Sequence, residues 1–196
     1  ETSTLNLGLE FIYEKDKWRH TLGATALRSK KSGTVDAERW TLTGQSDYKF
    51  DEKSYMFGAF RHDDDTFAGY NPVTSLSIGY GRELVNNNDK HFLLGEIGAG
   101  YRMQEVALTG LSEDGAIVRG RLDWRWTITD TTEFGNVFLV EAGSDNTFIQ
   151  NDTSLTVAIN KAFGLKLAYQ YRHNTDPPLG SDDTDTTITT NMFYSF

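Results

Sequence analysis

The 196-residue sequence contains no cysteine, three prolines and no stretch approaching 18 uninterrupted apolar residues. The absence of cysteine excludes a disulfide framework, a thiolate metal site and a cysteine nucleophile. Without a long apolar run, the chain has no transmembrane helix. Cations are also few: 19 Lys and Arg residues face 28 Asp and Glu residues, which gives a net charge of −9. This balance argues against nucleic acid as a partner, because phosphate binding needs clustered Lys and Arg.

A secretory leader is not visible either. Glu1 opens directly into a Thr-rich segment, with no basic and apolar leader before it. The chain is therefore either cytoplasmic or a form from which a leader has been removed.

Aromatic residues are plentiful, at 13% of the chain, and the apolar side chains recur at every second position. This period of two predicts β-strands, here roughly ten residues long and so longer than the strands of most soluble sheets. The clearest alternating series are Leu5, Leu7, Leu9, Phe11, Tyr13; Trp40, Leu42, Gly44, Tyr48; Val118, Leu122, Trp124, Trp126, Ile128; and Phe163, Leu165, Leu167, Tyr169, Tyr171.

The breaks between these strands alternate strictly between tight and long. Tight breaks fall at 15–17, 51–53, 86–89, 129–131 and 160–161, and longer ones at 31–36, 63–71, 104–114, 144–152 and 174–183. An antiparallel meander with short turns at one end and long loops at the other gives this pattern, which is typical of outer-membrane barrels. We therefore predict an all-β, transmembrane, antiparallel up-and-down β-barrel that occupies residues 1–196 as a single domain.

Eleven strands are predicted, at 2–14, 18–30, 36–49, 54–63, 73–84, 91–103, 115–128, 132–143, 152–159, 163–173 and 185–196. Bacterial single-chain barrels usually have an even number of strands. We therefore expect twelve, with the first strand upstream of Glu1. Direct pairing of 2–14 with 185–196 would contradict this expectation.

Alternation alone does not separate a membrane barrel, with its apolar side chains outward, from a soluble lipocalin-like barrel, with its apolar side chains inward. The aromatic residues favour the membrane barrel, because they cluster near strand ends, where amphipathic rings form girdles at the headgroup level. In this interpretation Trp124 and Trp126 point outward. The C-terminus adds Met192, Tyr194 and Phe196, which alternate up to a terminal aromatic residue as in the signal that the barrel assembly machinery reads.

Six segments resemble the YdiY-type family of salt-induced outer-membrane proteins, in the same order along the chain: Trp18–Leu22, Ala37–Trp40, Gln45–Lys49, Phe67–Tyr70, Val140–Thr147 and Tyr171–Asp176. The resemblance implies a Gram-negative outer-membrane β-barrel that is reached after removal of a signal peptide. It implies no activity, because the family is one of unknown function. No catalytic or binding residue follows from it.

The search for catalytic chemistry is largely negative, and we predict that the protein is not an enzyme. The four histidines, His20, His62, His91 and His173, are not spaced as a metal cluster. His62 beside Asp63–Asp65 resembles the Asp and His pairs of omptin-type proteases faintly, so an outer-membrane enzyme is the third function considered. An acidic solvated loop is the simpler interpretation of that segment.

Charge segregation is the informative feature. The parity assigned to the lumen holds ten cations and six anions. We predict a lumen charge network of Arg19, Arg39, Asp47, Lys49, Arg61, Glu96, Arg119, Arg121, Asp123, Arg125, Lys166 and Arg172. Such a network would brace a closed or narrow barrel that supports the envelope or a salt-stress response, since unpaired charges are costly inside a narrow lumen. The alternative is a porin-like, weakly anion-preferring channel for small solutes.

The long loops are strongly acidic, and their carboxylates would repel one another and the phosphates of the outer leaflet. Solvated loops screened by salt would relieve this repulsion. Alternatively, loosely bound Ca²⁺ or Mg²⁺ would bridge carboxylates to lipopolysaccharide. The candidate metal ligands are Asp63, Asp64, Asp65, Asp182, Asp183 and Asp185. No other cofactor is expected, and the oligomeric state does not follow from the sequence.

Overall fold

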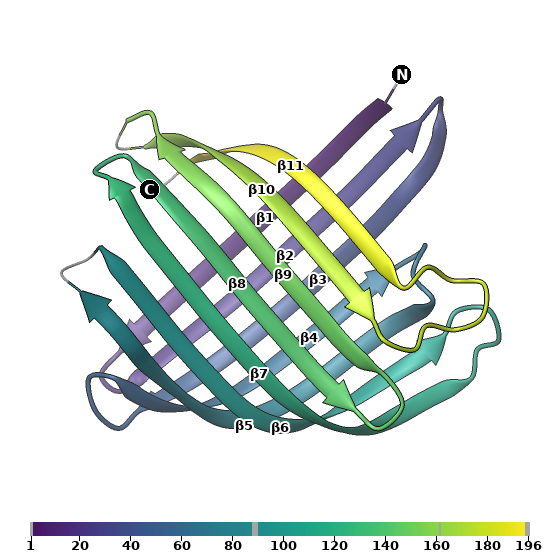
Figure 1. Cartoon of the computed structure of the whole chain (residues 1–196), viewed down its shortest axis with the longest axis horizontal. Coiled ribbons are helices and arrows are strands. Elements are labelled where there is room, and N and C mark those ends of the chain that lie inside the picture. Colours follow the sequence, from purple (N-terminus) through teal and green to yellow (C-terminus); the bar gives the residue numbers. More distant parts are fainter. Residues whose placement is uncertain (1, 88–89, 161, 195–196) are drawn as a thin grey trace.

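The structure is a computed structural model that describes residues 2–87, 90–160 and 162–194. These ranges contain eleven β-strands that curl into a nearly closed barrel (Figure 1). Their bounds are β1 Thr2–Lys15, β2 Trp18–Lys31, β3 Thr34–Lys49, β4 Ser54–Asp65, β5 Tyr70–Asn87, β6 His91–Val106, β7 Ser112–Thr129, β8 Thr132–Gly143, β9 Thr147–Ala158, β10 Phe163–Asn174 and β11 Thr184–Tyr194. The prediction of an all-β antiparallel barrel is confirmed. Within these ranges no helix has the length and apolarity needed to cross a bilayer.

Every strand pairs antiparallel with its neighbours in sequence, so the sheet order is β1 to β11 without a crossover. The connections that follow β1, β3, β5, β7 and β9 lie at one end of the barrel, the turn end, and those that follow the even-numbered strands lie at the other, the loop end (Figure 1). At that second end the connection between β10 and β11 is long, as predicted, whereas residues 32–33 alone join β2 to β3, so the long break predicted at 31–36 is wrong. Several strands continue into segments predicted as loops: β5 begins at Tyr70, β7 at Ser112 and β9 at Thr147. The strands therefore extend beyond the apolar band on the loop side. Outside that band, charged residues are compatible with a paired strand.

The barrel has two edges. Strands β1 and β11 both run from the loop end to the turn end, because an odd number of strands in a meander leaves the first and last parallel to each other (Figure 1). Among the described residues, β1 pairs with β2 alone and β11 with β10 alone. The direct pairing that would contradict a further strand is thus not found. That strand, expected upstream of Glu1, lies outside the described residues and stays a prediction.

The two faces of the sheet divide as a membrane barrel requires. Large apolar side chains point outward along every strand, and Leu9, Ile78, Ile97, Leu122 and Ile188 are examples that remain exposed. Trp124 and Trp126 lie on this outward face, opposite in parity to the arginines of the same strand. Because apolar groups avoid water, an outward apolar face of this extent fits a lipid environment.

Inside the barrel, a small apolar cluster packs Tyr55 and Phe57 of β4 against Leu94 of β6. Two glycines of β5 make room for it. A Cβ on Gly79 would lie 2.6 Å from the Phe57 ring, and one on Gly81 would lie 2.3 Å from the Tyr55 ring. The rings of Tyr55 and Phe57 therefore occupy the space that side chains at Gly79 and Gly81 would fill.

Candidate functional site: the charged lumen

Glu96 lies at the centre of the lumen network. Its carboxylate accepts hydrogen bonds from the Arg119 guanidinium at 2.8 Å, the Tyr55 hydroxyl at 2.7 Å and the Gln45 amide at 2.8 Å. Gln45 also donates to Asp47 at 2.9 Å. The two carboxylates are thus linked through one amide, and all of these groups lie within the barrel.

Asp47 extends this layer to the neighbouring strand β2. Its carboxylate accepts from the Arg19 guanidinium, with a closest approach of 2.6 Å. Two guanidinium groups stack on the apolar cluster: Arg19 lies 5.2 Å from the centre of the Tyr55 ring and Arg119 lies 4.8 Å from that of Phe57. Cation–π contacts of this kind stabilise a desolvated arginine that has limited access to water.

This mid-lumen layer is nearly inaccessible to solvent. The exposed fraction is 1% for Asp47, 3% for Phe57, 5% for Glu96 and 7% for Arg119. Buried ions need complete hydrogen bonding to be tolerated. That condition is met here, since no buried side-chain nitrogen or oxygen among the described residues lacks a partner.

Toward the turn end, the network becomes more exposed. Asp123 forms ion pairs with Arg121 at 3.0 Å and with Arg125 at 3.5 Å, both on its own strand β7. Arg121 also lies 3.8 Å from Glu96, whereas Arg125 stacks 4.2 Å from the centre of the Phe92 ring. Among the described residues, Arg125 thus forms its ion pair within its own strand, whereas Arg119 and Arg121 reach Glu96 of β6.

Toward the loop end, a second cluster connects strands that are distant in sequence. Asp63 pairs with Arg61 at 2.5 Å and with Arg172 of β10 at 3.5 Å. Asp65 pairs with Arg172 at 3.4 Å and with Arg39 of β3 at 3.7 Å. These contacts join β3, β4 and β10 across the lumen.

The same cluster reaches the edge strand β11 and an aromatic ring of β9. Arg39 contacts Asp185 of β11 at 3.2 Å. The Phe148 ring is stacked by two guanidiniums, with Arg61 4.5 Å and Arg172 5.2 Å from its centre. The loop end is therefore braced by contacts among β3, β4, β9, β10 and β11.

The residues of this cluster line a cavity of about 580 Å³ on the loop side. We call it the vestibule. Arg39, Arg102, Glu141, Phe148 and Asp183 are among its lining residues, whereas Asp47, Glu96 and Arg119 are not. The mid-lumen layer thus lies outside the vestibule.

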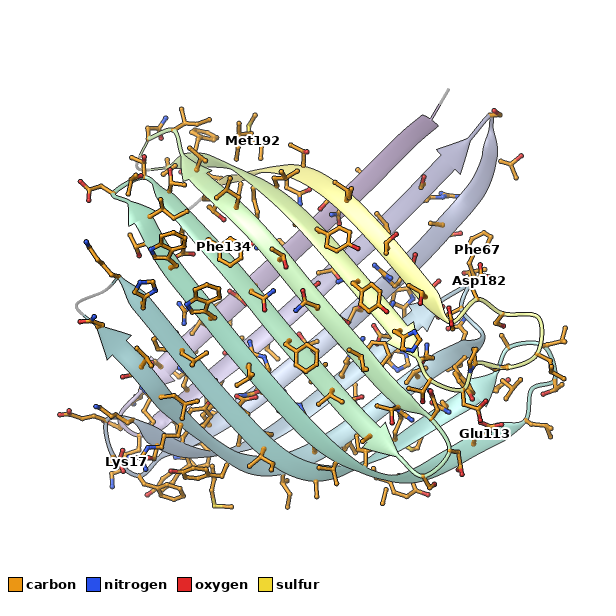
Figure 2. All side chains as sticks on the ribbon, in the orientation of Figure 1. Lys17, Phe67, Glu113, Phe134, Asp182 and Met192 are labelled. Atoms are coloured by element: carbon orange, nitrogen blue, oxygen red, sulfur yellow. The ribbon has the colours of Figure 1, made fainter. Side chains whose placement is uncertain are left out.

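Hydrogen bonds join the loops at this end of the barrel. The Tyr70 hydroxyl donates to the backbone carbonyl of Asp176 at 3.0 Å, and the Asp176 N–H donates to Asn146 Oδ1 at 3.2 Å. Gly69 packs so tightly that a Cβ there would lie 2.6 Å from the Ser181 hydroxyl. Figure 2 shows Phe67 and Asp182 near each other at this end of the barrel, with Glu113 at the same end and Lys17 at the opposite one.

The structure shows which charges the sequence reasoning missed. Five carboxylates that were not counted have lumen partners: Glu14 with Lys49, Asp63 with Arg61, Asp65 with Arg172, Asp152 with Gln150 and Gln170, and Asp185 with Arg39. With them, lumen carboxylates match the ten cations to within one charge, and the predicted surplus of positive charge disappears. Four of the five lie in segments assigned to loops or loop borders. Within the described residues, Lys166 has no ion-pair partner.

The acidic residues proposed as metal ligands are not brought together. Asp63 and Asp65 face the lumen and are held by arginines, whereas Asp64 lies on the opposite face and contacts Asn71 at 3.3 Å. In the described part of the chain, no group of three or more His, Cys, Asp or Glu residues is placed to hold a metal ion. Binding of Ca²⁺ or Mg²⁺ by Asp182, Asp183 or Asp185 stays a prediction.

All four histidines lie on the outward face, each beside an aromatic ring. His20 stacks on Trp18, His91 on Trp126, His62 packs against Trp40 and His173 stacks on Tyr171. His62 Nδ1 is hydrogen-bonded to Thr74 at 2.7 Å. It therefore points away from Asp63, with which a protease-like pair would be made.

The residues of the predicted assembly signal lie at the end of β11. Met192 and Tyr194 point outward and are exposed, and Tyr194 packs against Phe163 of β10 with ring centres 5.1 Å apart. Phe196 lies outside the described residues. Reading of this signal by the assembly machinery stays a prediction.

Comparison with known proteins gives both a family and a fold. A family model described as "Protein of unknown function, DUF481" matches residues 1–196. The uncharacterized protein YdiY of Escherichia coli (strain K12) is 28% identical over 176 residues, which are 89% of this chain and 69% of YdiY.

Two solved structures resemble the barrel. The NanC porin has a TM-score of 0.65 at 8% sequence identity, with 100% of this chain and 94% of that chain covered. The β domain of the Bordetella autotransporter BrkA has a TM-score of 0.44 at 15% identity, with 100% and 91% covered. At 8% sequence identity, the comparison with the NanC porin shows a shared fold and nothing further.

Proposed function

The chain belongs to the DUF481 family of proteins of unknown function, and from its lumen we propose that it is a closed outer-membrane barrel that supports the bacterial envelope. One observation carries the proposal: the mid-lumen layer of Asp47, Phe57, Glu96 and Arg119 is almost fully withdrawn from solvent. A water-filled pore would leave its charged lining groups hydrated. Here they are hydrogen-bonded to one another instead.

Several parts of this proposal go beyond the barrel itself. The outward apolar face and the fold shared with a porin support a location in the outer membrane. Removal of a signal peptide, insertion by the barrel assembly machinery, contact with lipopolysaccharide and a role in the response to salt belong to the proposal on the strength of the sequence. The proposal includes no catalytic role, in keeping with the outward position of His62.

The test is single-channel conductance of the purified full-length protein in planar bilayers. A closed barrel gives no unitary current steps. A Glu96→Ala/Arg119→Ala double variant removes the centre of the layer and should produce steps, whereas a Glu38→Ala variant, which alters an exposed pair with Arg28, should not. Regular steps from the unmodified protein would contradict the proposal.

A second candidate function is a narrow channel for small solutes. The observation that favours it is local: at the turn end Arg121 and Arg125 share one carboxylate, Asp123, and Arg125 is half-exposed. Such a mouth would prefer anions weakly. If steps are seen, their reversal potential in a salt gradient should shift toward the anion equilibrium potential, and an Arg125→Gln variant should reduce that shift.

A further inference from the structure

Two oppositely charged side chains line the vestibule without forming an ion pair. Arg102 of β6 is 4% exposed, and its guanidinium donates to two backbone carbonyl oxygens, those of Glu141 at 3.3 Å and Asn146 at 2.6 Å. Glu141 of β8 is 3% exposed, and its carboxylate accepts one hydrogen bond, from the Ser75 hydroxyl at 3.1 Å. Among the described residues, no carboxylate pairs with Arg102 and no cation pairs with Glu141. Each charge is therefore buried without the counter-ion that buried charges normally have.

The other arginines of the cavity already have such partners. Arg39, Arg61 and Arg172 also line the vestibule, and each of them is paired with an aspartate. Arg102 lies opposite Ser75 in the pairing of β5 with β6, and Ser75 is the residue that donates to Glu141. The unpaired guanidinium and the unpaired carboxylate are therefore neighbours at one side of the cavity.

A third polar group beside them lacks a partner. Gln104 of β6 is 6% exposed and lines the vestibule, yet its side-chain amide has no hydrogen bond to any described residue. In the same part of the chain, every fully enclosed side-chain nitrogen and oxygen does have a partner. The Gln104 amide and the second carboxylate oxygen of Glu141 must therefore border open space, and the vestibule is the cavity that both residues line.

We propose that the vestibule binds a small zwitterion of the α-amino acid type. Its ammonium donates to the Glu141 carboxylate and to Gln104 Oε1, and its carboxylate accepts from the Arg102 guanidinium, which has five N–H donors and uses two of them in the barrel. An α-amino acid carries its two charges close together, as the neighbouring positions of Arg102 and Glu141 require. An anion alone would leave Glu141 unpaired, and a cation alone would leave Arg102 unpaired.

The size and place of the cavity suit such a ligand. Its volume of about 580 Å³ falls within the range of about 300–1,000 Å³ that is usual for small-molecule sites. The vestibule lies outside the mid-lumen layer, so a ligand can bind there without passing that layer. The inference therefore holds whether or not the barrel conducts ions.

Saturation-transfer difference NMR of the full-length protein in deuterated detergent at pH 7 tests the proposal. The probe is L-alanine, and its matched half-ligands are ethylammonium, which lacks the carboxylate, and propionate, which lacks the ammonium. L-Alanine should receive saturation from the protein, and each half-ligand should bind roughly tenfold or more weakly, because a charge-assisted hydrogen bond is lost in each case. No transfer to L-alanine, or binding of one half-ligand as tight as that of L-alanine, would overturn the proposal.

Substitution of the carboxylate separates its two roles. Glu141→Gln keeps the shape of the side chain and an acceptor for Ser75, and it removes the charge that faces the ammonium. It should weaken the binding of L-alanine and ethylammonium roughly tenfold and leave that of propionate undiminished. The matched control is Glu14→Gln, which removes a carboxylate that pairs with Lys49 and does not line the vestibule, and it should bind L-alanine as the unmodified protein does. Unchanged binding of L-alanine by Glu141→Gln, or an equal loss for all three probes, would refute the proposal.

Discussion

Glu96 receives hydrogen bonds from three strands, and its side chain is fully inaccessible to solvent. Replacing it by alanine would leave Arg119 buried without its carboxylate partner. We expect Glu96→Ala to lower the free energy of unfolding by about 3–5 kcal/mol, as when one member of a buried ion pair is removed. Urea unfolding in lipid vesicles, followed by tryptophan fluorescence, measures the change.

The matched control is Glu38→Ala. Glu38 pairs with Arg28 at 3.5 Å on the outward side, and both side chains are about half exposed. Exposed pairs contribute about 0–1 kcal/mol, so this variant should unfold almost as the unmodified protein does. An equal decrease in the free energy of unfolding for the two variants would show that the buried pair of Glu96 stabilises the barrel no more than an exposed pair does.

Asp51 lies in the turn between β3 and β4 and accepts backbone hydrogen bonds from the N–H groups of Lys53 and Ser54, both at 2.8 Å. The bond from Lys53 contributes most to holding the pKa of Asp51 below its usual value. Because the folded pKa is lowered, the stabilisation by Asp51 is present above the unfolded pKa near 3.8 and is lost as the pH falls through the folded value. Unfolding measured against pH should therefore show the unmodified protein losing its advantage over Asp51→Asn in this acidic window. A difference that stays constant to pH 2 would contradict the assignment.

At the scale of the strand, the sequence predicted the elements better than their ends. The alternation that marks β8 gave its bounds at 132–143, as the structure has them. The loop-side extension of β4 was missed because Asp64 and Asp65 look like loop residues in composition, and the prediction ended β4 at Asp63 and began β9 at Asp152, two carboxylates placed on the border between strand and loop. Whether such a residue faces the lumen depends on partners such as Arg172 that come from a distant strand, and alternation within one segment contains no information about them.

Gly79 shows how tightly neighbouring strands are packed inside the barrel. A Cβ there would lie 2.3 Å from the Ile97 carbonyl oxygen and 2.6 Å from the Phe57 ring. Gly79→Ala should therefore cost about 1–3 kcal/mol through overpacking, measured by the urea midpoint in vesicles. Gly58, on β4, has open space at its Cβ, and Gly58→Ala should be tolerated. A Gly79→Ala variant as stable as Gly58→Ala would mean that β5 and β6 can separate without cost.

The long loops allow a test of the predicted divalent cations. Asp63 and Asp65 are already paired with arginines, so Asp182 and Asp183 are left as the main candidates on the loop between β10 and β11. We expect Ca²⁺ or Mg²⁺ at about 10 mM, a level that fills weak extracellular sites, to change the thermal midpoint little. A rise of several degrees that is lost in an Asp182→Asn/Asp183→Asn variant would establish a cation site there instead.

At the scale of the whole molecule, the two edge strands β1 and β11 determine how the barrel closes. In a bilayer the backbone groups of an edge strand have no water to bond, so spanning sheets must be closed. Since β1 and β11 run in the same direction, one more strand running the opposite way between them restores an all-antiparallel barrel. We expect Leu7→Cys/Ile188→Cys, with one cysteine on each edge, to form no disulfide in the membrane-inserted protein, whereas Phe11→Cys/Leu22→Cys on the paired strands β1 and β2 should form one. Rapid oxidation of the first pair would show that the two edges meet directly.

The order of the strands also bears on how fast such a barrel can form. Each strand pairs with strands adjacent to it in sequence, so ten hairpins can form one after another with little loss of chain entropy. Closure is different, because it must bring together segments separated by nearly the whole chain. We expect the contact between Arg39 and Asp185, 146 residues apart, to form at that last step. The lumen charges near this contact would then stabilise the barrel only after it has closed. Their loss would leave the rate of hairpin formation unchanged and shorten the lifetime of the closed barrel.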